Sequence, residues 1–101
     1  MIIYNVTVKI DLDTHDDWLQ WMKDVHVPDV VATGLFSECK ICRLLTVDES
    51  DGITYAFQYF CENMAAFEKY QEVHATNLQK DHTERYKDKF VAFRTLMEVV
   101  N

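Results

Sequence analysis

Three polar residues, Asn5, His26 and Arg94, could carry out acid–base chemistry on a small molecule. A neutral imidazole exchanges protons near pH 7, so His26 could accept a proton from a substrate. Arg94 could hold the resulting enolate, or a carboxylate, by charge-assisted hydrogen bonds, while the Asn5 amide positions an oxygen. Two of these residues also have structural interpretations, because Asn5 could bond within a half-buried strand and His26 could cap a helix end.

Further residues could line a binding site together with these three. The candidate ligand-binding residues are Asn5, Thr7, Gln58, Phe60, Tyr70, His74 and Arg94. His74 follows Tyr70 at helical spacing, which is equally typical of a hydrogen-bonded core histidine. His82 lies in a charged stretch, and we predict that it is exposed at the surface.

The cysteines and the first acidic cluster predict neither a redox centre nor a metal site. Cys39 and Cys42 match C-x-x-C but lie in a predicted strand, where positions three apart point to opposite faces. Cys61 adds too few ligands for zinc. The acidic segment that begins at Asp11 lacks the glycine and the final acid of a calcium loop. An odd number of cysteines is atypical of a disulfide-bonded secreted domain, so we expect reduced thiols and a cytoplasmic location.

Length and composition favour one folded domain over residues 1–101. The chain is 49% hydrophobic and 27% charged, which excludes disorder. Its formal net charge of −7 repels phosphate backbones and anionic lipids, so we expect neither nucleic-acid binding nor membrane association. No run of 18 apolar residues suggests a membrane span, and the chain start lacks the pattern of a signal peptide.

Periodicity predicts a strand over residues 2–10 followed by a helix. One face of the strand carries Ile2, Tyr4, Val6, Val8 and Ile10. Thr14 and Asp17 have the spacing of a capping box that opens the helix. The apolar stripe of this helix would consist of Trp18, Trp21, Met22 and Val25. Pro28 should push Val27 out of helical geometry and break the helix near His26.

Two strands, a long helix and a last strand complete the predicted order. Residues 35–47 and 53–61 read as an antiparallel pair joined by a hairpin turn over 48–52. Asn63 can cap a helix that extends to residue 89, with a bend near Asp81. The apolar side of this helix would carry Phe67, Tyr70, Val73, His74, Asn77 and Leu78. Residues 90–100 return to a strand pattern.

This order predicts an α+β, ferredoxin-like βαββαβ sandwich. Right-handed crossovers place the first and third strands at the centre of a four-stranded antiparallel sheet, with both helices on one face. The second face mixes polar residues such as Asn5 and Gln58 with apolar residues such as Phe60 and Phe93. We therefore expect a homodimer in which two sheets pack face to face around a cavity.

The pattern W-x-x-W-x-x-x-x-H-V-P-x-x-x-x-x-G-L-F over residues 18–36 resembles the first helix and second strand of the dimeric α/β-barrel superfamily. That superfamily includes antibiotic-biosynthesis-monooxygenase and EthD-like proteins. The segment Y-A-F-Q-Y-F-C-E-N-M-A-A-F-E-K-Y over residues 55–70 resembles their third strand and second helix. More closely, the chain resembles a small bacterial family of unknown function within this superfamily. The resemblance implies a dimeric α/β barrel, and it marks Asn5 as the position of a functional asparagine.

The resemblance to heme-degrading members is partial. Their second helix carries a Trp and a His, where this chain has Tyr70 and His82, so we expect no heme and no other cofactor.

The sequence as a whole leaves three candidate functions. The first is a noncatalytic homodimer that binds a small apolar molecule between its sheets. The second is a cofactor-independent monooxygenase or isomerase-like enzyme, and the third is a protein-interaction module that docks partners on an edge strand.

Overall fold

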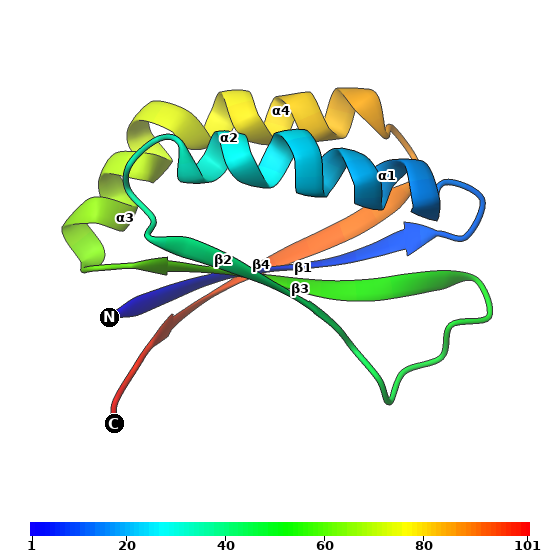
Figure 1. Cartoon of the computed structure of the whole chain (residues 1–101), viewed down its shortest axis with the longest axis horizontal. Helices are drawn as coiled ribbons and strands as arrows, with labels where there is room; N and C mark the ends of the chain where they lie inside the picture. The colour runs from blue at the N-terminus through cyan, green and yellow to red at the C-terminus, as the bar shows by residue number, and fades with distance from the viewer.

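The computed structural model describes all 101 residues as a four-stranded antiparallel sheet with two helical segments on one face (Figure 1). The strands are β1 (Ile2–Asp11), β2 (Glu38–Arg43), β3 (Gly52–Cys61) and β4 (Phe90–Glu98). Their order in the sheet is β2-β3-β1-β4, so β1 and β3 are central. The predicted ferredoxin-like fold is confirmed, although β2 is shorter than the predicted strand over residues 35–47.

The first helical segment runs from α1 (His15–Trp21) through the π-helical turn η1 (Met22–His26) to α2 (Val27–Val31). The prediction that Pro28 breaks this helix is wrong, because Val27 keeps helical angles of φ −61° and ψ −46°. The Val27 N–H bonds to the Met22 carbonyl through the wider π turn. Pro28 then occupies the start of α2, where its missing N–H removes no hydrogen bond.

The capping box predicted at the start of α1 does not form. Thr14 precedes the helix, but its hydroxyl donates to the Asp13 carboxylate at 2.8 Å and satisfies no helical N–H. Val25, which we predicted to belong to the apolar stripe, is exposed, whereas Trp18 and Met22 are buried. The buried side of this segment continues at Val30, because the π turn moves the later residues around the helix.

The second helical segment consists of α3 (Met64–Tyr70), the π turn η2 (Gln71–Ala75) and α4 (Thr76–Arg85). The predicted cap is confirmed, since the Asn63 side chain accepts a hydrogen bond from the Ala66 N–H at 2.9 Å. The irregular turn lies at residues 71–75 and not near Asp81, where we predicted a bend. None of the helices is both long enough and apolar enough to cross a membrane.

The π turn η2 overturns three predictions about which residues face the sheet. The buried positions Tyr70 and Ala75 are five residues apart, a spacing that a π turn provides and a regular helix does not. The extra residue rotates all of α4 relative to α3. Val73 and Asn77 are consequently exposed, and His82, predicted to lie at the surface, is buried with 4% exposure.

Alternation along the strands divides the sheet into two faces. The face under the helices carries the core, which includes Ile2, Tyr4, Val8, Ile10, Tyr55, Phe57, Tyr59 and Cys61. The opposite face, which we call the open face, has no element of this chain over it, as the bare underside of the sheet in Figure 1 shows. The two central strands pair with Tyr4 opposite Tyr59 and Val6 opposite Phe57, so these four residues share the helix side.

Candidate functional site

A small cavity lies between the helices and the sheet, on the covered side of the molecule. Twelve residues line it: Tyr4, Val6, Val8, Met22, His26, Val30, Phe57, Tyr59, Tyr70, Gln79, His82 and Arg94. Its volume is about 20 Å³, which is room for a water molecule and little more. Both π turns border it, through Met22 and His26 in η1 and through Tyr70 next to η2. Such turns are frequent at functional sites.

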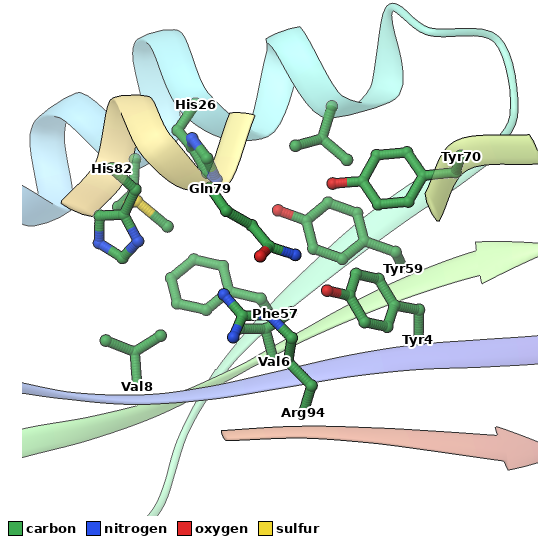
Figure 2. Close-up of a pocket in the computed structure, with 12 residues that line it drawn as sticks. Tyr4, Val6, Val8, His26, Phe57, Tyr59, Tyr70, Gln79, His82 and Arg94 are labelled. Atoms are coloured by element: carbon green, nitrogen blue, oxygen red, sulfur yellow. The ribbon is translucent and has the colours of Figure 1, made fainter. Parts of the chain in front are cut away.

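Arg94 is the only charged residue that lines the cavity. It pairs in register with Val6 on the edge strand β4, and this register directs its side chain toward the helices. Figure 2 shows the guanidinium rising from β4 toward Gln79. Arg94 forms no ion pair, and none of the lining residues is a carboxylate. The site therefore presents an uncompensated positive charge.

Three tyrosines form one side of the cavity and direct their hydroxyl groups toward its middle (Figure 2). Burial raises the pKa of Tyr4, an effect that the nearby Arg94 and Gln79 oppose. Burial also raises the pKa values of Tyr59 and Tyr70. All three are consequently neutral hydroxyls at physiological pH, able to donate a hydrogen bond to an anion.

His82 is held in a fixed orientation on the other side of the cavity. The Trp18 indole N–H donates to Nε2 of His82 at 2.9 Å, and the imidazole stacks on Phe90 with ring centroids 4.0 Å apart. Burial, followed by the neighbouring His26 and Arg94, lowers the pKa of His82 to about 3. This histidine is neutral, and the nitrogen that could accept a proton already accepts a hydrogen bond.

His26 is the free imidazole of the pair. Its ring lies 5.4 Å from that of His82 and 5.2 Å from the Trp21 ring, and it forms no hydrogen bond. Burial lowers the pKa of His26 to about 4, although Asp29 and Asp81 partly offset this and Arg94 adds to it. The ring also borders an outer groove next to Asp29 and Asp81. His26 is thus a neutral base that could exchange protons between the cavity and solvent.

The structure brings together some of the predicted site residues and separates others. His26, Tyr70 and Arg94 all line the cavity. Asn5 lies on the open face, beyond the sheet from Arg94, so these residues do not converge on one substrate. His74 stacks beside Tyr70 at 6.4 Å but is not part of the cavity wall.

The remaining candidates, Thr7, Gln58 and Phe60, share the open face with Asn5. They are the residues that we expected around a cavity between two sheets. The cavity in this chain is instead on the helix side of the same sheet. The candidate ligand-binding residues therefore form two groups, with the thickness of the sheet between them.

Sequence reasoning missed four polar members of the cavity, namely Tyr4, Tyr59, Gln79 and His82. The alternation grouped Tyr4 and Tyr59 with the apolar residues of their strands, but nothing in the pattern distinguished a cavity tyrosine from a core tyrosine. Gln79 and His82 were not predicted to face the sheet, because the π turn changes the face of α4 that meets it. A five-residue gap between buried positions is the signal that would have found them.

The cysteines are free, and no three His, Cys, Asp or Glu side chains form a group that could hold a metal ion. Cys39 faces the helices beside Tyr59, whereas Cys42 is exposed and belongs to the open face. Burial raises the pKa of the Cys39 thiol to about 12, so this residue is unreactive.

A family model for a domain of unknown function, DUF4286, matches residues 1–100. The chain belongs to this family. No curated protein matches the DUF4286 chain in sequence. The resemblance to a family of unknown function is thereby confirmed, and it assigns no activity.

Solved structures with the same fold include proteins described as dimeric ferredoxin-like, EthD family and antibiotic biosynthesis monooxygenase. A dimeric ferredoxin-like protein from an uncultured marine organism aligns with a TM-score of 0.73 at 12% identity, covering 100% of this chain and 96% of its own. An EthD family protein from Bacillus halodurans gives 0.68 at 11% identity, covering 99% and 100%. A crystal structure described as an antibiotic biosynthesis monooxygenase gives 0.63 at 18% identity, covering all of both chains. At these identities the likeness shows the fold alone.

Proposed function

We propose that this DUF4286 protein is a homodimer in which each copy binds a small molecule carrying an acidic group. The observation that carries the proposal is the unpaired Arg94 guanidinium in a cavity lined by neutral hydroxyls and imidazoles. Arg94 is an exposed residue whose guanidinium is free to pair, and it can hold a carboxylate by charge-assisted hydrogen bonds. The ligand that we expected between the sheets is therefore proposed for the helix side.

The cavity must widen to accept more than a water molecule. Gln79 and Arg94 are long, flexible side chains that project into its middle (Figure 2), and Arg94 starts from an edge strand. Movement of these two side chains enlarges the space without disturbing the aromatic walls. The walls of Tyr4, Phe57, Tyr59 and Tyr70 favour a planar, apolar body behind the acidic group.

Homodimer formation is supported by the open face. Val91 and Phe93 of β4 project from it with 69% and 64% exposure, an unusual position for large apolar side chains in a water-facing sheet. Similar folds include proteins described as dimeric ferredoxin-like. The three free thiols fit a reducing compartment, for which we propose the cytoplasm.

Titration with a matched pair of ligands tests the binding proposal. Benzoate and the neutral isostere benzamide are titrated into wild type, Arg94→Gln and the control Arg43→Gln, with binding followed by calorimetry. Benzoate should bind wild type and the control equally and bind Arg94→Gln at least about tenfold more weakly, because a charge-assisted pair is lost. Arg43 is a suitable control because it is paired with Glu49 at the hairpin, away from the cavity. Equal binding of both ligands, or no binding, would contradict the proposal.

A second candidate is a monooxygenase or isomerase-like enzyme. The unbonded, neutral His26 beside Arg94 favours it, because one residue could take a proton from the substrate while the other stabilises the resulting anion. Asn5 would not take part in this chemistry, since it lies on the other face. Polycyclic phenols are screened for oxygen uptake, and wild type should be faster than His26→Ala and Arg94→Ala. Equal rates would remove the enzymatic candidate.

The third candidate, a protein-interaction module, rests on the short edge strand β2. Its unpaired edge is where an extended peptide could add a further strand. A stoichiometric complex with such a peptide, lost when Ile41→Pro blocks the edge, is the expected result for this candidate.

A further inference from the structure

His26 lines the cavity with ring nitrogens that a small molecule can reach and that no side chain uses. The imidazole forms no hydrogen bond within the chain. The only buried side-chain nitrogen or oxygen atom without a partner belongs to Asn5, so neither nitrogen of His26 is closed off. A neutral imidazole has one N–H group and one bare nitrogen that accepts a hydrogen bond. His26 therefore offers a ligand an unused acceptor.

The charges around His26 favour the tautomer whose bare nitrogen faces the cavity. Asp29 and Asp81 border the outer groove on one side of the ring, and Arg94 lines the cavity on the other. The two carboxylates raise the pKa of His26 and so favour a proton on the ring, whereas the guanidinium lowers this pKa. The N–H group consequently belongs on the groove side, near the carboxylates, and the lone pair belongs on the cavity side.

The neighbouring His82 shows which donor suits an imidazole in these surroundings. Its Nε2 accepts a hydrogen bond from the indole N–H of Trp18 at 2.9 Å. His26 lies next to His82, with ring centroids 5.4 Å apart, and it also has a tryptophan beside it. That tryptophan, Trp21, stacks on the ring of His26, so its N–H does not point at a ring nitrogen. His26 thus has aromatic neighbours like those of His82 but lacks the aromatic N–H donor.

The cavity wall beside His26 favours a donor that brings no lone pair with it. Met22 and Val30 lie one helical turn before and after His26, and both line the cavity with apolar side chains. A hydroxyl placed against them would leave its own lone pairs without donors, whereas the N–H of a heteroaromatic ring has no lone pair to satisfy. The tyrosine hydroxyls that could serve a ligand oxygen form another side of the cavity (Figure 2).

We infer that the ligand is a heteroaromatic carboxylate whose ring N–H donates to the cavity-facing nitrogen of His26 while its carboxylate pairs with Arg94. This inference rests on the proposed binding of an acidic molecule and names the chemical class of that molecule. His26 approaches from the helices and Arg94 from the sheet, with Gln79 between them in the view of Figure 2. The N–H group and the carboxylate should therefore lie at opposite ends of a planar ring system, as they do in indole-5-carboxylate.

Calorimetric titration of indole-5-carboxylate and benzofuran-5-carboxylate tests the contact, because the second acid has an oxygen in place of the N–H group. Wild type should bind the indole acid about tenfold more tightly, since the furan oxygen cannot donate. His26→Phe should bind both acids equally, because its ring can still stack on Trp21 but has no acceptor. His74→Phe is the control, because His74 is not part of the cavity wall, and it should keep the tenfold preference.

Nitrogen NMR of wild type gives a second measurement that does not depend on the folding of a variant. The indole acid should shift the resonance of one ring nitrogen of His26, because a bare nitrogen that accepts a hydrogen bond changes its shielding. The benzofuran acid should shift this resonance far less. Equal shifts with the two acids would show that the ring N–H does not reach His26.

Each other outcome of the titrations overturns a definite statement. If wild type binds both acids equally and Arg94→Gln weakens both, the His26 contact is wrong and the binding of acidic molecules stands. A preference for the indole acid that survives in His26→Phe also removes His26 as the acceptor. If benzoate binds wild type and neither larger acid does, only the inference fails. If none of the three acids binds, the inference and the proposed function fail together.

Discussion

At the scale of single residues, the cavity depends on histidines that stay uncharged because of their surroundings. His82 accepts the Trp18 N–H at Nε2, and this contact is incompatible with a charged ring that must donate from both nitrogens. His26 and Arg94 each disfavour protonation of His82. A proton on either imidazole would place two positive charges in one water-sized space.

Acid should therefore destabilise the protein through these two histidines. Their pKa values fall from 6.5 to about 4 for His26 and about 3 for His82 on folding, so only the unfolded chain takes up protons as the pH falls below 6.5. Stability is complete above that pH and declines as the pH approaches the folded values. At pH 5 the loss should be about 2 kcal/mol per histidine relative to pH 7.5.

Urea unfolding at pH 7.5 and pH 5 measures this loss, and His82→Gln provides the comparison. The variant is less stable at both pH values, but its change between them should be about half that of wild type. Asp13, Asp48 and Glu49 also have lowered pKa values, and their contribution is lost below about pH 4.5, outside this window. Equal changes in wild type and variant would show that His82 is not held neutral.

Among individual residues, the sequence identified those whose chemistry is rare and missed those whose chemistry is common. His26 and Arg94 were singled out because an imidazole can take a proton near pH 7 and a guanidinium can hold an anion, and both line the cavity. Tyr4 and Gln79 are ordinary in type, and only the three-dimensional structure shows that they meet Arg94. Asn5 was singled out from the family resemblance, and it lies on the open face, away from the cavity.

At the scale of elements, the two helical segments begin in different ways. The Asn63 side chain caps α3 through the Ala66 N–H, whereas Thr14 bonds to Asp13 and leaves α1 without a side-chain cap. Both residues precede their helices directly, so sequence spacing alone does not separate the two cases. The difference arises because the Asp13 carboxylate competes for the Thr14 hydroxyl.

Alanine substitution should distinguish the two helix starts. Asn63→Ala should lower the free energy of unfolding by about 1 kcal/mol, because the Ala66 N–H loses its partner. Thr14→Ala is the matched control and should cost less than about half that amount. Chemical denaturation of both variants measures the difference. A larger loss for Thr14→Ala would mean that Thr14 caps α1 in solution.

Strand order was predictable from the sequence, but the course of the helices was not. Alternation in β1 and β3 is strict, and a one-residue error would have placed polar residues in the core. Helical patterns, by contrast, were read with one fixed period, and each segment contains a π turn that breaks it. One extra residue in the turn at residues 71–75 was enough to make the prediction for His82 wrong, because this residue is buried and not exposed.

At the scale of the whole molecule, the proposed homodimer depends on the open face. Phe93→Asp should prevent dimer formation, because it places a charge in a surface that the proposed dimer would bury. The dimer dissociation constant should rise at least about thirtyfold. Sedimentation at micromolar concentration should then report the 11.9 kDa monomer. Leu45→Asp is the control, since Leu45 is 87% exposed and lies outside the sheet, and it should leave the dimer intact.

The central position of β1 also has a consequence for biosynthesis. β1 pairs with β3 on one side and with β4 on the other, yet it is the first of the four strands to leave the ribosome and β4 is the last. During translation its apolar residues therefore remain without their second neighbour until β4 has been made. Slow elongation through residues 63–89 should prolong this interval and increase the demand for chaperones, because an unpaired strand edge promotes aggregation.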